Sequence, residues 1–97
     1  MRIVAVTACP TGVAHTYMAA EQLEKTARKL GHTIKVETQG AMGLENELSQ
    51  AEIDAADVAI FAADIAVERS ERFARIRTIE VPVQGVLRHP ESVFAKI

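Results

Sequence analysis

The sequence of 97 residues has one cysteine, no tryptophan, and no hydrophobic run near the roughly 20 residues that a membrane helix needs. A single cysteine excludes an internal disulfide and a cysteine-rich metal site. The net charge is only −2, from 11 basic and 13 acidic residues. This balance argues against non-specific nucleic-acid binding, which uses a basic face. The first four residues are too short and too mixed for a signal peptide. We therefore expect no metal site, no nucleic-acid partner and no direct membrane insertion.

The composition is that of an ordinary globular chain. Hydrophobic residues make up 48% and charged residues 25%, so the bulk of the chain is not disordered. The length suits one core. We expect a single soluble, cytoplasmic domain over residues 1–97.

The hydrophobic pattern predicts alternating strands and helices. Strands are expected at 2–7, 33–38, 58–63 and 76–81. Helices are expected at 13–30, 49–56, 67–75 and 83–97, the last with a break near His89-Pro90. Gly31 is placed to cap the first helix, and Ser49 with Glu52 forms a capping-box pattern.

Alternation of this kind predicts an α/β fold, a small doubly wound sheet of four parallel strands in the flavodoxin-like order 2-1-3-4. In such sheets, ligands bind beyond the carboxyl ends of the strands, at the switch point between strands 1 and 3. The loop after the first strand is therefore the first candidate site, and it contains the single cysteine.

The segment 7–16 has the features of an anion-binding loop. Backbone N–H groups at a helix N-terminus lack partners within the helix, and the helix dipole adds partial positive charge. Gly12 lets the backbone turn closely around a ligand. We expect the phosphate-binding residues to be Pro10, Thr11, Gly12, Val13, Ala14, His15 and Thr16.

Cys9 begins this loop. The positive end of a helix favours the thiolate form of a cysteine, and a thiolate beside bound phosphate can accept a phosphoryl group. The alternative is that Cys9 is a small buried apolar residue, which is common for a lone cysteine. The glycine-containing turn at the switch point favours the nucleophile.

The stretch 9–20, CPTGVAHTYMAA, resembles the fructose-type enzyme IIB domain of the bacterial phosphoenolpyruvate-dependent sugar phosphotransferase system. The resemblance continues at 36–40 (VETQG), at Glu45-Asn46 and at 62–64 (AAD), and it covers nearly the whole chain. It implies that Cys9 is the phosphorylated nucleophile of a protein-phosphohistidine–sugar phosphotransferase.

The resemblance also implies the partners of this chain. A histidine of enzyme IIA would supply the phosphoryl group. A sugar, fructose or a related compound, held by the membrane-embedded enzyme IIC would receive it. The chain would lie in the cytoplasm, at the inner face of the bacterial membrane through enzyme IIC, and would need no cofactor.

Three further residues are candidates with open roles. His15 stands where the similar loop of low-molecular-weight tyrosine phosphatases has arginine; it either donates one hydrogen bond to phosphate or bonds locally at the helix start. Asp64 ends the third strand and either acts in a second shell around Cys9 or, as we favour, caps the following helix. Gln39 either lies beside the site or belongs to an ordinary turn. The charge run 68–72 is expected to be a solvated helix face.

Two other functions fit part of the sequence. A hydrolase like the low-molecular-weight tyrosine phosphatases would use the same loop, but the chain lacks arginine at position 15 and an Asp-Pro pair to supply an acid. A flavodoxin-like mononucleotide-binding module would need aromatic residues for the ring, and the chain has one tyrosine and three phenylalanines. No Gly-x-Gly-x-x-Gly follows the first strand, which argues against a dinucleotide-binding domain.

Overall fold

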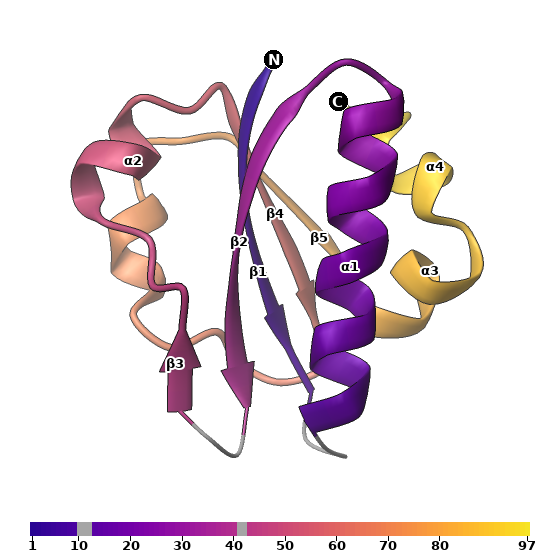
Figure 1. Cartoon of the computed structure of the whole chain (residues 1–97). Helices are drawn as coiled ribbons and strands as arrows, with labels where there is room; N and C mark the ends of the chain where they lie inside the picture. Colours follow the sequence, from indigo (N-terminus) through magenta and orange to yellow (C-terminus); the bar gives the residue numbers. More distant parts are fainter. Residues whose placement is uncertain (10–12, 41–42) are drawn as a thin grey trace.

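The structure is a computed structural model that describes residues 1–9, 13–40 and 43–97. These residues form one five-stranded sheet with helices on both faces (Figure 1). The strands are β1 (Arg2–Ala8), β2 (Thr33–Gly40), β3 (Gly43–Glu45), β4 (Val58–Ala63) and β5 (Thr78–Val81). Their order across the sheet is β3-β2-β1-β4-β5.

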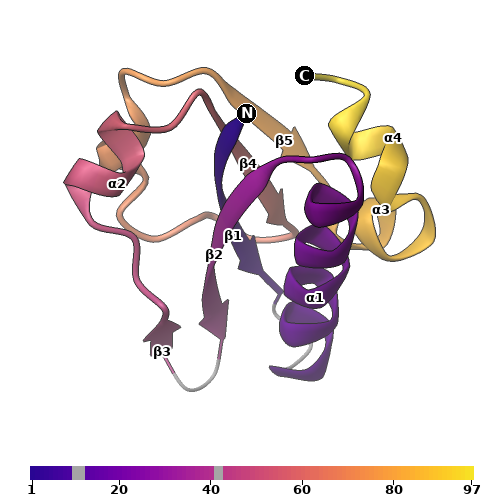
Figure 2. The ribbon, with the colours of Figure 1, turned by 45° about the horizontal axis from the view of Figure 1, so that its top comes forward.

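The helices fall into two layers. They are α1 (Val13–Lys29), α2 (Gln50–Asp54), α3 (Val83–Arg88) and α4 (Pro90–Phe94), with a 3-10 helix η1 (Ser70–Phe73). Figures 1 and 2 show α1, α3 and α4 against one face of the sheet and α2 against the other. No helix in the described segments is both long and apolar enough to cross a membrane.

Each layer of helices closes its own core. On the α1 side the buried side chains include Ile3, Leu23, Ile60 and Val86. On the α2 side they include Val6, Leu48, Ile53, Phe61 and Phe73. The strands β1 and β4 lie between the two cores and are buried along almost their whole length, which is why both are nearly continuous apolar runs.

The strand register brings three chain segments to one level of the sheet. Ala8 of β1 pairs with Gln39 of β2 on one side and with Ala63 of β4 on the other. The residues that follow these partners, Cys9 and Asp64 among them, therefore lie at the carboxyl end of the sheet. Both termini lie at the opposite end in Figures 1 and 2.

The predicted four-strand sheet is confirmed in the order of its strands and wrong in their number. The strands β2, β1, β4 and β5 are parallel and lie in the expected order. The additional strand β3 is antiparallel to β2, with Thr38 opposite Glu45 and Gly40 opposite Gly43. Three residues, mostly exposed, are too few for an alternating pattern, so only the pairing with β2 defines this strand.

Two predicted helix signals are confirmed. Gly31 ends α1 at a φ of +82°, and the N–H groups of Gly31 and His32 donate to the carbonyls of Arg28 and Ala27. This is the Schellman pattern that favours glycine. Ser49 caps α2, and its capping box with Glu52 is complete. The helix α2 ends at Asp54, two residues before the expected end.

The helix predicted for 67–75 is wrong. The segment contains turns and the short helix η1, and Arg69 before it has a φ of +58°. A helix cannot pass through a residue in the left-handed region. The expected break near His89-Pro90 is confirmed, because α3 ends at Arg88 and α4 begins at Pro90.

Candidate functional site

Cys9 follows directly after β1 and is almost completely buried, with 7% of its surface exposed. It belongs to the core on the α1 side. The buried Thr7 two residues earlier donates its hydroxyl to the carbonyl of Thr16 at 3.1 Å. This bond ties the end of β1 to the first turns of α1, so the cysteine and the start of the helix occupy fixed relative positions.

The first turn of α1 contains part of the predicted phosphate-binding loop. The helix begins at Val13 and has no acidic residue in its first turn, so no carboxylate there opposes an anion. Ala14 and His15 are exposed, whereas Thr16 is buried. Pro10, Thr11 and Gly12 lie outside the described residues, so their binding of phosphate stays a prediction.

Asp64 directly follows β4 and contacts the cysteine. The Cys9 thiol donates to Asp64 Oδ2 at a sulfur–oxygen distance of 3.9 Å. The other oxygen, Oδ1, accepts the backbone N–H of Val83 at 3.1 Å, at the start of α3. Asp64 therefore caps the start of α3. The favoured prediction, a cap for the helix after β4, is wrong, because the segment after Asp64 forms turns and not the expected helix. The same carboxylate is also next to Cys9, and its action on the cysteine stays a prediction.

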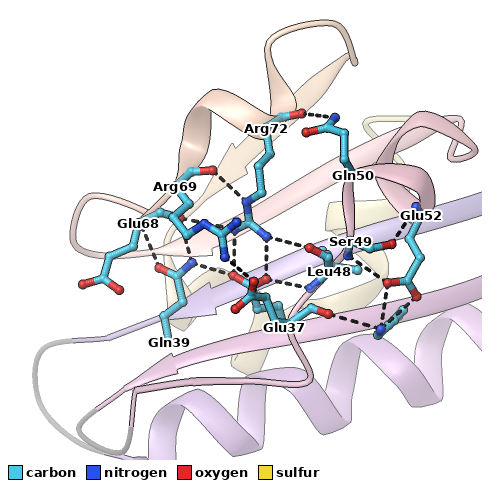
Figure 3. A network of polar contacts seen from close by, with 11 residues as sticks. Glu37, Gln39, Leu48, Ser49, Gln50, Glu52, Glu68, Arg69 and Arg72 are labelled. Atoms are coloured by element: carbon cyan, nitrogen blue, oxygen red, sulfur yellow. Dashed lines mark hydrogen bonds and ion pairs between the residues drawn. The ribbon is translucent and has the colours of Figure 1, made fainter.

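The side chain of Gln39 forms its hydrogen bonds on the α2 side of the sheet, away from Cys9. Its amide nitrogen donates to Glu37 Oε2 at 2.7 Å and to the Glu68 carbonyl at 3.0 Å, and its amide oxygen accepts the Glu68 N–H at 2.8 Å. Figure 3 shows these bonds together. The structure therefore places the Gln39 side chain in a separate polar network and not against Cys9.

The centre of that network is a buried ion pair. Arg72 Nη1 and Nη2 donate to the two carboxylate oxygens of Glu37 at 2.8 and 2.9 Å (Figure 3). Glu37 has no exposed surface and Arg72 has 8%. The Leu48 N–H donates to Glu37 Oε1, and Arg72 donates to the carbonyls of Leu48 and Arg69. Every oxygen of the Glu37 carboxylate thus has two donors.

The balance of burial and hydrogen bonding sets the charge state of this pair. Burial pushes the pKa of the Glu37 carboxyl upward, but hydrogen bonds from Arg72, Gln39 and the Leu48 backbone outweigh burial and leave the pKa below its usual value. The hydrogen bonds to Glu37 raise the pKa of Arg72. Both partners are therefore ionised, and the pair links β2 to the segments around Leu48 and η1.

The expected solvated face for 68–72 is wrong at Arg72, which is buried. No residue pattern within the run distinguishes Arg72 from exposed Arg69. One signal was available in the sequence: a strand with glutamate at position 37 between valine and threonine needs a partner for that charge if it is buried. The partner is far along the chain, so only the tertiary structure identifies it.

A groove of about 510 Å³ lies at the carboxyl ends of β4 and β5, beside the segment that carries Asp64. Its lining includes Ile65, Val67 and Pro82, and Ile65 is 46% exposed. A second groove, of about 400 Å³, lies at the amino ends of β1 and β2 beside α2. Only the first is at the same end of the sheet as Cys9. The described residues contain no group of three or more side chains that could hold a metal ion.

Comparison with known proteins identifies close relatives over the whole fold. A family described as PTS system, Lactose/Cellobiose specific IIB subunit matches residues 4–96. The fructose-like EIIB component 2 of the Escherichia coli K12 PTS is 47% identical over 96 residues, which are 99% of this chain and 91% of the relative. The 2-O-alpha-mannosyl-D-glycerate-specific EIIABC component of the same organism is 53% identical over 92 residues, 95% of this chain. The chain spans only 14% of that longer relative.

Solved structures agree with these matches. A crystal structure of a predicted fructose-specific IIB from Escherichia coli has a TM-score of 0.94 and 45% identity, covering 99% of this chain and 85% of that one. A domain of a fructose-specific IIABC component from Borrelia burgdorferi has a TM-score of 0.93 and 44% identity, covering 98% and 90%. The chain therefore belongs to the enzyme IIB family of the sugar phosphotransferase system, with fructose-type relatives, as the resemblance predicted.

Proposed function

We propose that Cys9 carries a phosphoryl group from a histidine of enzyme IIA to a sugar, fructose or a related compound, held by enzyme IIC. A role in phosphoryl transfer within a sugar phosphotransferase system follows from family membership. The observation that supports the cysteine as carrier is its position between the end of β1 and the start of α1, beside a first turn without acidic residues.

The chemistry requires two transfers that balance. In the first, the Cys9 sulfur attacks phosphorus, the S–P bond forms and the N–P bond of phosphohistidine breaks. The electron pair of the N–P bond stays on the imidazole, and the thiol proton ends on that nitrogen. In the second, a sugar oxygen attacks phosphorus, the O–P bond forms and the S–P bond breaks; the electron pair stays on sulfur, which takes up the hydroxyl proton. Both are in-line displacements, for which positioning supplies most of the catalysis.

The loop and first turn of α1 would bind the phosphoryl oxygens. Residues 11–16 would supply backbone N–H groups and two threonine hydroxyls near the start of α1, which suit a phosphate dianion, whereas Pro10 has no N–H to donate. The partners follow from the same scheme: enzyme IIA as donor, and membrane-embedded enzyme IIC as the acceptor that brings this chain to the inner face of the membrane. Relatives named for fructose and for mannosylglycerate share the domain, which suits a carrier whose sugar is selected by enzyme IIC.

The test is transfer of phosphate from phosphorylated enzyme IIA, followed by intact mass and peptide mapping. We expect one phosphoryl group on the wild-type chain, on Cys9, and none on Cys9→Ser, because a serine hydroxyl is a much weaker nucleophile at neutral pH. His15→Ala, which removes the other nucleophilic side chain of the loop, should still be labelled on Cys9. Full labelling of Cys9→Ser together with loss in His15→Ala would move the acceptor to the histidine. Rapid hydrolysis of p-nitrophenyl phosphate by the wild type would indicate the hydrolase instead.

A further inference from the structure

The carboxylate of Asp64 has a defined position next to the reacting sulfur. Its own backbone N–H donates to the Ala8 carbonyl at 3.0 Å, so the residue extends the pairing of β4 with β1. Its Oδ1 accepts the Val83 N–H at 3.1 Å, and its Oδ2 is 3.9 Å from Cys9 Sγ. The backbone of Asp64 is thus bonded to the sheet, and one side-chain oxygen is bonded to α3. The second oxygen is directed at the Cys9 sulfur.

The charge of Asp64 acts differently on the two states of Cys9. In the resting state the thiol donates a hydrogen bond to the carboxylate, which is favourable. In the phosphorylated state the sulfur carries a group with nearly two negative charges, and like charges in a shared site repel. None of the ion pairs among residues 1–9, 13–40 and 43–97 includes Asp64, so no described lysine or arginine side chain neutralises this repulsion.

We propose that Asp64 destabilises phospho-Cys9 relative to the free thiol and thereby makes the cysteine a stronger phosphoryl donor to the sugar. The inference rests on Cys9 being the carrier, as proposed above. The first turn of α1 has no acidic residue to oppose a phosphoryl group on Cys9, whereas Asp64 places a carboxylate beside the sulfur. A carrier has to release what it accepts, and one opposing charge keeps phospho-Cys9 from being too stable to pass its phosphoryl group on.

This role uses no additional reactant. The bonds formed and broken are those of the two transfers, and Asp64 neither gains nor loses a proton over the cycle. Its effect is on the equilibrium between phosphohistidine on enzyme IIA and phosphocysteine on this chain. In the resting state the same carboxylate accepts the hydrogen bond of the Cys9 thiol, so its removal should also change the reactivity of the sulfur.

The experiment measures that equilibrium directly. Enzyme IIA is phosphorylated, separated from its own donor, and mixed with the wild-type chain or with Asp64→Asn, and ³¹P NMR gives the ratio of phosphocysteine to phosphohistidine. Asparagine has the same shape and can still accept the Val83 N–H, so the substitution removes the charge and keeps the cap. Glu68→Gln is the matched control, since Glu68 is an exposed carboxylate after the same strand, and its backbone N–H bonds to Gln39 on the other face of the sheet.

We expect Asp64→Asn to shift the equilibrium toward phospho-Cys9 by about threefold to tenfold, a range limited by the solvent exposure of Asp64. Alkylation of the resting Cys9 by iodoacetamide at pH 7 should become faster by a similar factor. Glu68→Gln should change neither value by more than about twofold. Melting temperatures of the variants report on the fold separately.

Two outcomes would overturn the inference, and neither is confused with failure of the proposed function. A folded Asp64→Asn variant with the wild-type equilibrium would show that the charge does not act on phospho-Cys9. An equal shift in Glu68→Gln would show a general charge effect instead of a contact. Absence of any label on wild-type Cys9 would reject the carrier function itself, before the variants are compared.

Discussion

Two carboxylates near the carboxyl end of the same sheet have opposite surroundings. Glu37, on the α2 side, is fully buried and receives N–H donors on both oxygens, including the guanidinium of Arg72. Asp64, on the Cys9 side, is exposed and contacts one thiol and one backbone N–H. The partners of a fully paired charge compensate its electrostatic field, so such a charge exerts little force on a ligand. A charge with incomplete compensation beside a nucleophile can influence the reaction.

The two regions are also connected. Gln39 and Arg72 bond to the backbone of Glu68, and Glu68 is four residues after Asp64. The buried pair therefore anchors the segment that carries Asp64 away from β4. In this view the network on the α2 side is a support, and the site on the α1 side is the part that reacts. Three substitutions test this division, in addition to those at Cys9 and Asp64.

The largest effect is expected from Arg72→Met. The variant leaves Glu37 buried without its cation, so we expect a loss of about 3–5 kcal/mol in the free energy of unfolding, measured by urea denaturation. Arg75→Met, at an exposed arginine three residues later, should change it by less than about 0.5 kcal/mol. The double variant Glu37→Gln/Arg72→Met should be more stable than Arg72→Met alone. Equal stability of the Arg72 and Arg75 variants would contradict the support role.

A smaller effect is expected from Gln39→Ala. It removes one donor to Glu37 and both links to Glu68, and a buried group that loses a partner costs about 1–3 kcal/mol. The alkylation rate of Cys9 should stay at the wild-type value, because the Gln39 side chain bonds on the opposite face of the sheet. Gln84→Ala, an exposed glutamine on α3, is the control for stability. A changed alkylation rate of Cys9 in a Gln39→Ala protein of wild-type stability would show that Gln39 acts on the cysteine after all.

The smallest effect is expected at Glu52, a half-buried carboxylate that, like Glu37, accepts hydrogen bonds from a cation and from a backbone N–H. Hydrogen bonds from Lys35 and from the Ser49 backbone lower the pKa of Glu52 from 4.5 to about 2. Because the folded-state pKa is lowered, the stabilisation is fully present above about pH 4.5 and is lost as the pH falls toward about 2. Glu52→Gln should therefore lower the melting temperature slightly at pH 7, and the difference from wild type should shrink over that range. A difference that is constant from pH 7 to 2 would contradict this assignment.

Elements with long local patterns could be predicted from the sequence. The four parallel strands, the helix α1 with its glycine stop, the capping box at Ser49 and the break at Pro90 all depend on hydrophobic period or on one residue's backbone preference. The strand β3 and the irregular segment before η1 could not be predicted in this way. Their conformations depend on pairing with β2 and on the positive φ of Arg69, and neither leaves a repeating pattern.

The same distinction applies to the polar residues. The sequence by itself determined the α/β alternation, the place of Cys9 after the first strand and its family, because these follow from local pattern and motif. Only the tertiary structure decided that Glu37 pairs with Arg72, 35 positions later, and that one carboxylate contacts both Cys9 and Val83. Strand register and chain crossings decide which side chains come within hydrogen-bond distance of a buried charge. These neighbours depend on the whole fold and not on local sequence pattern.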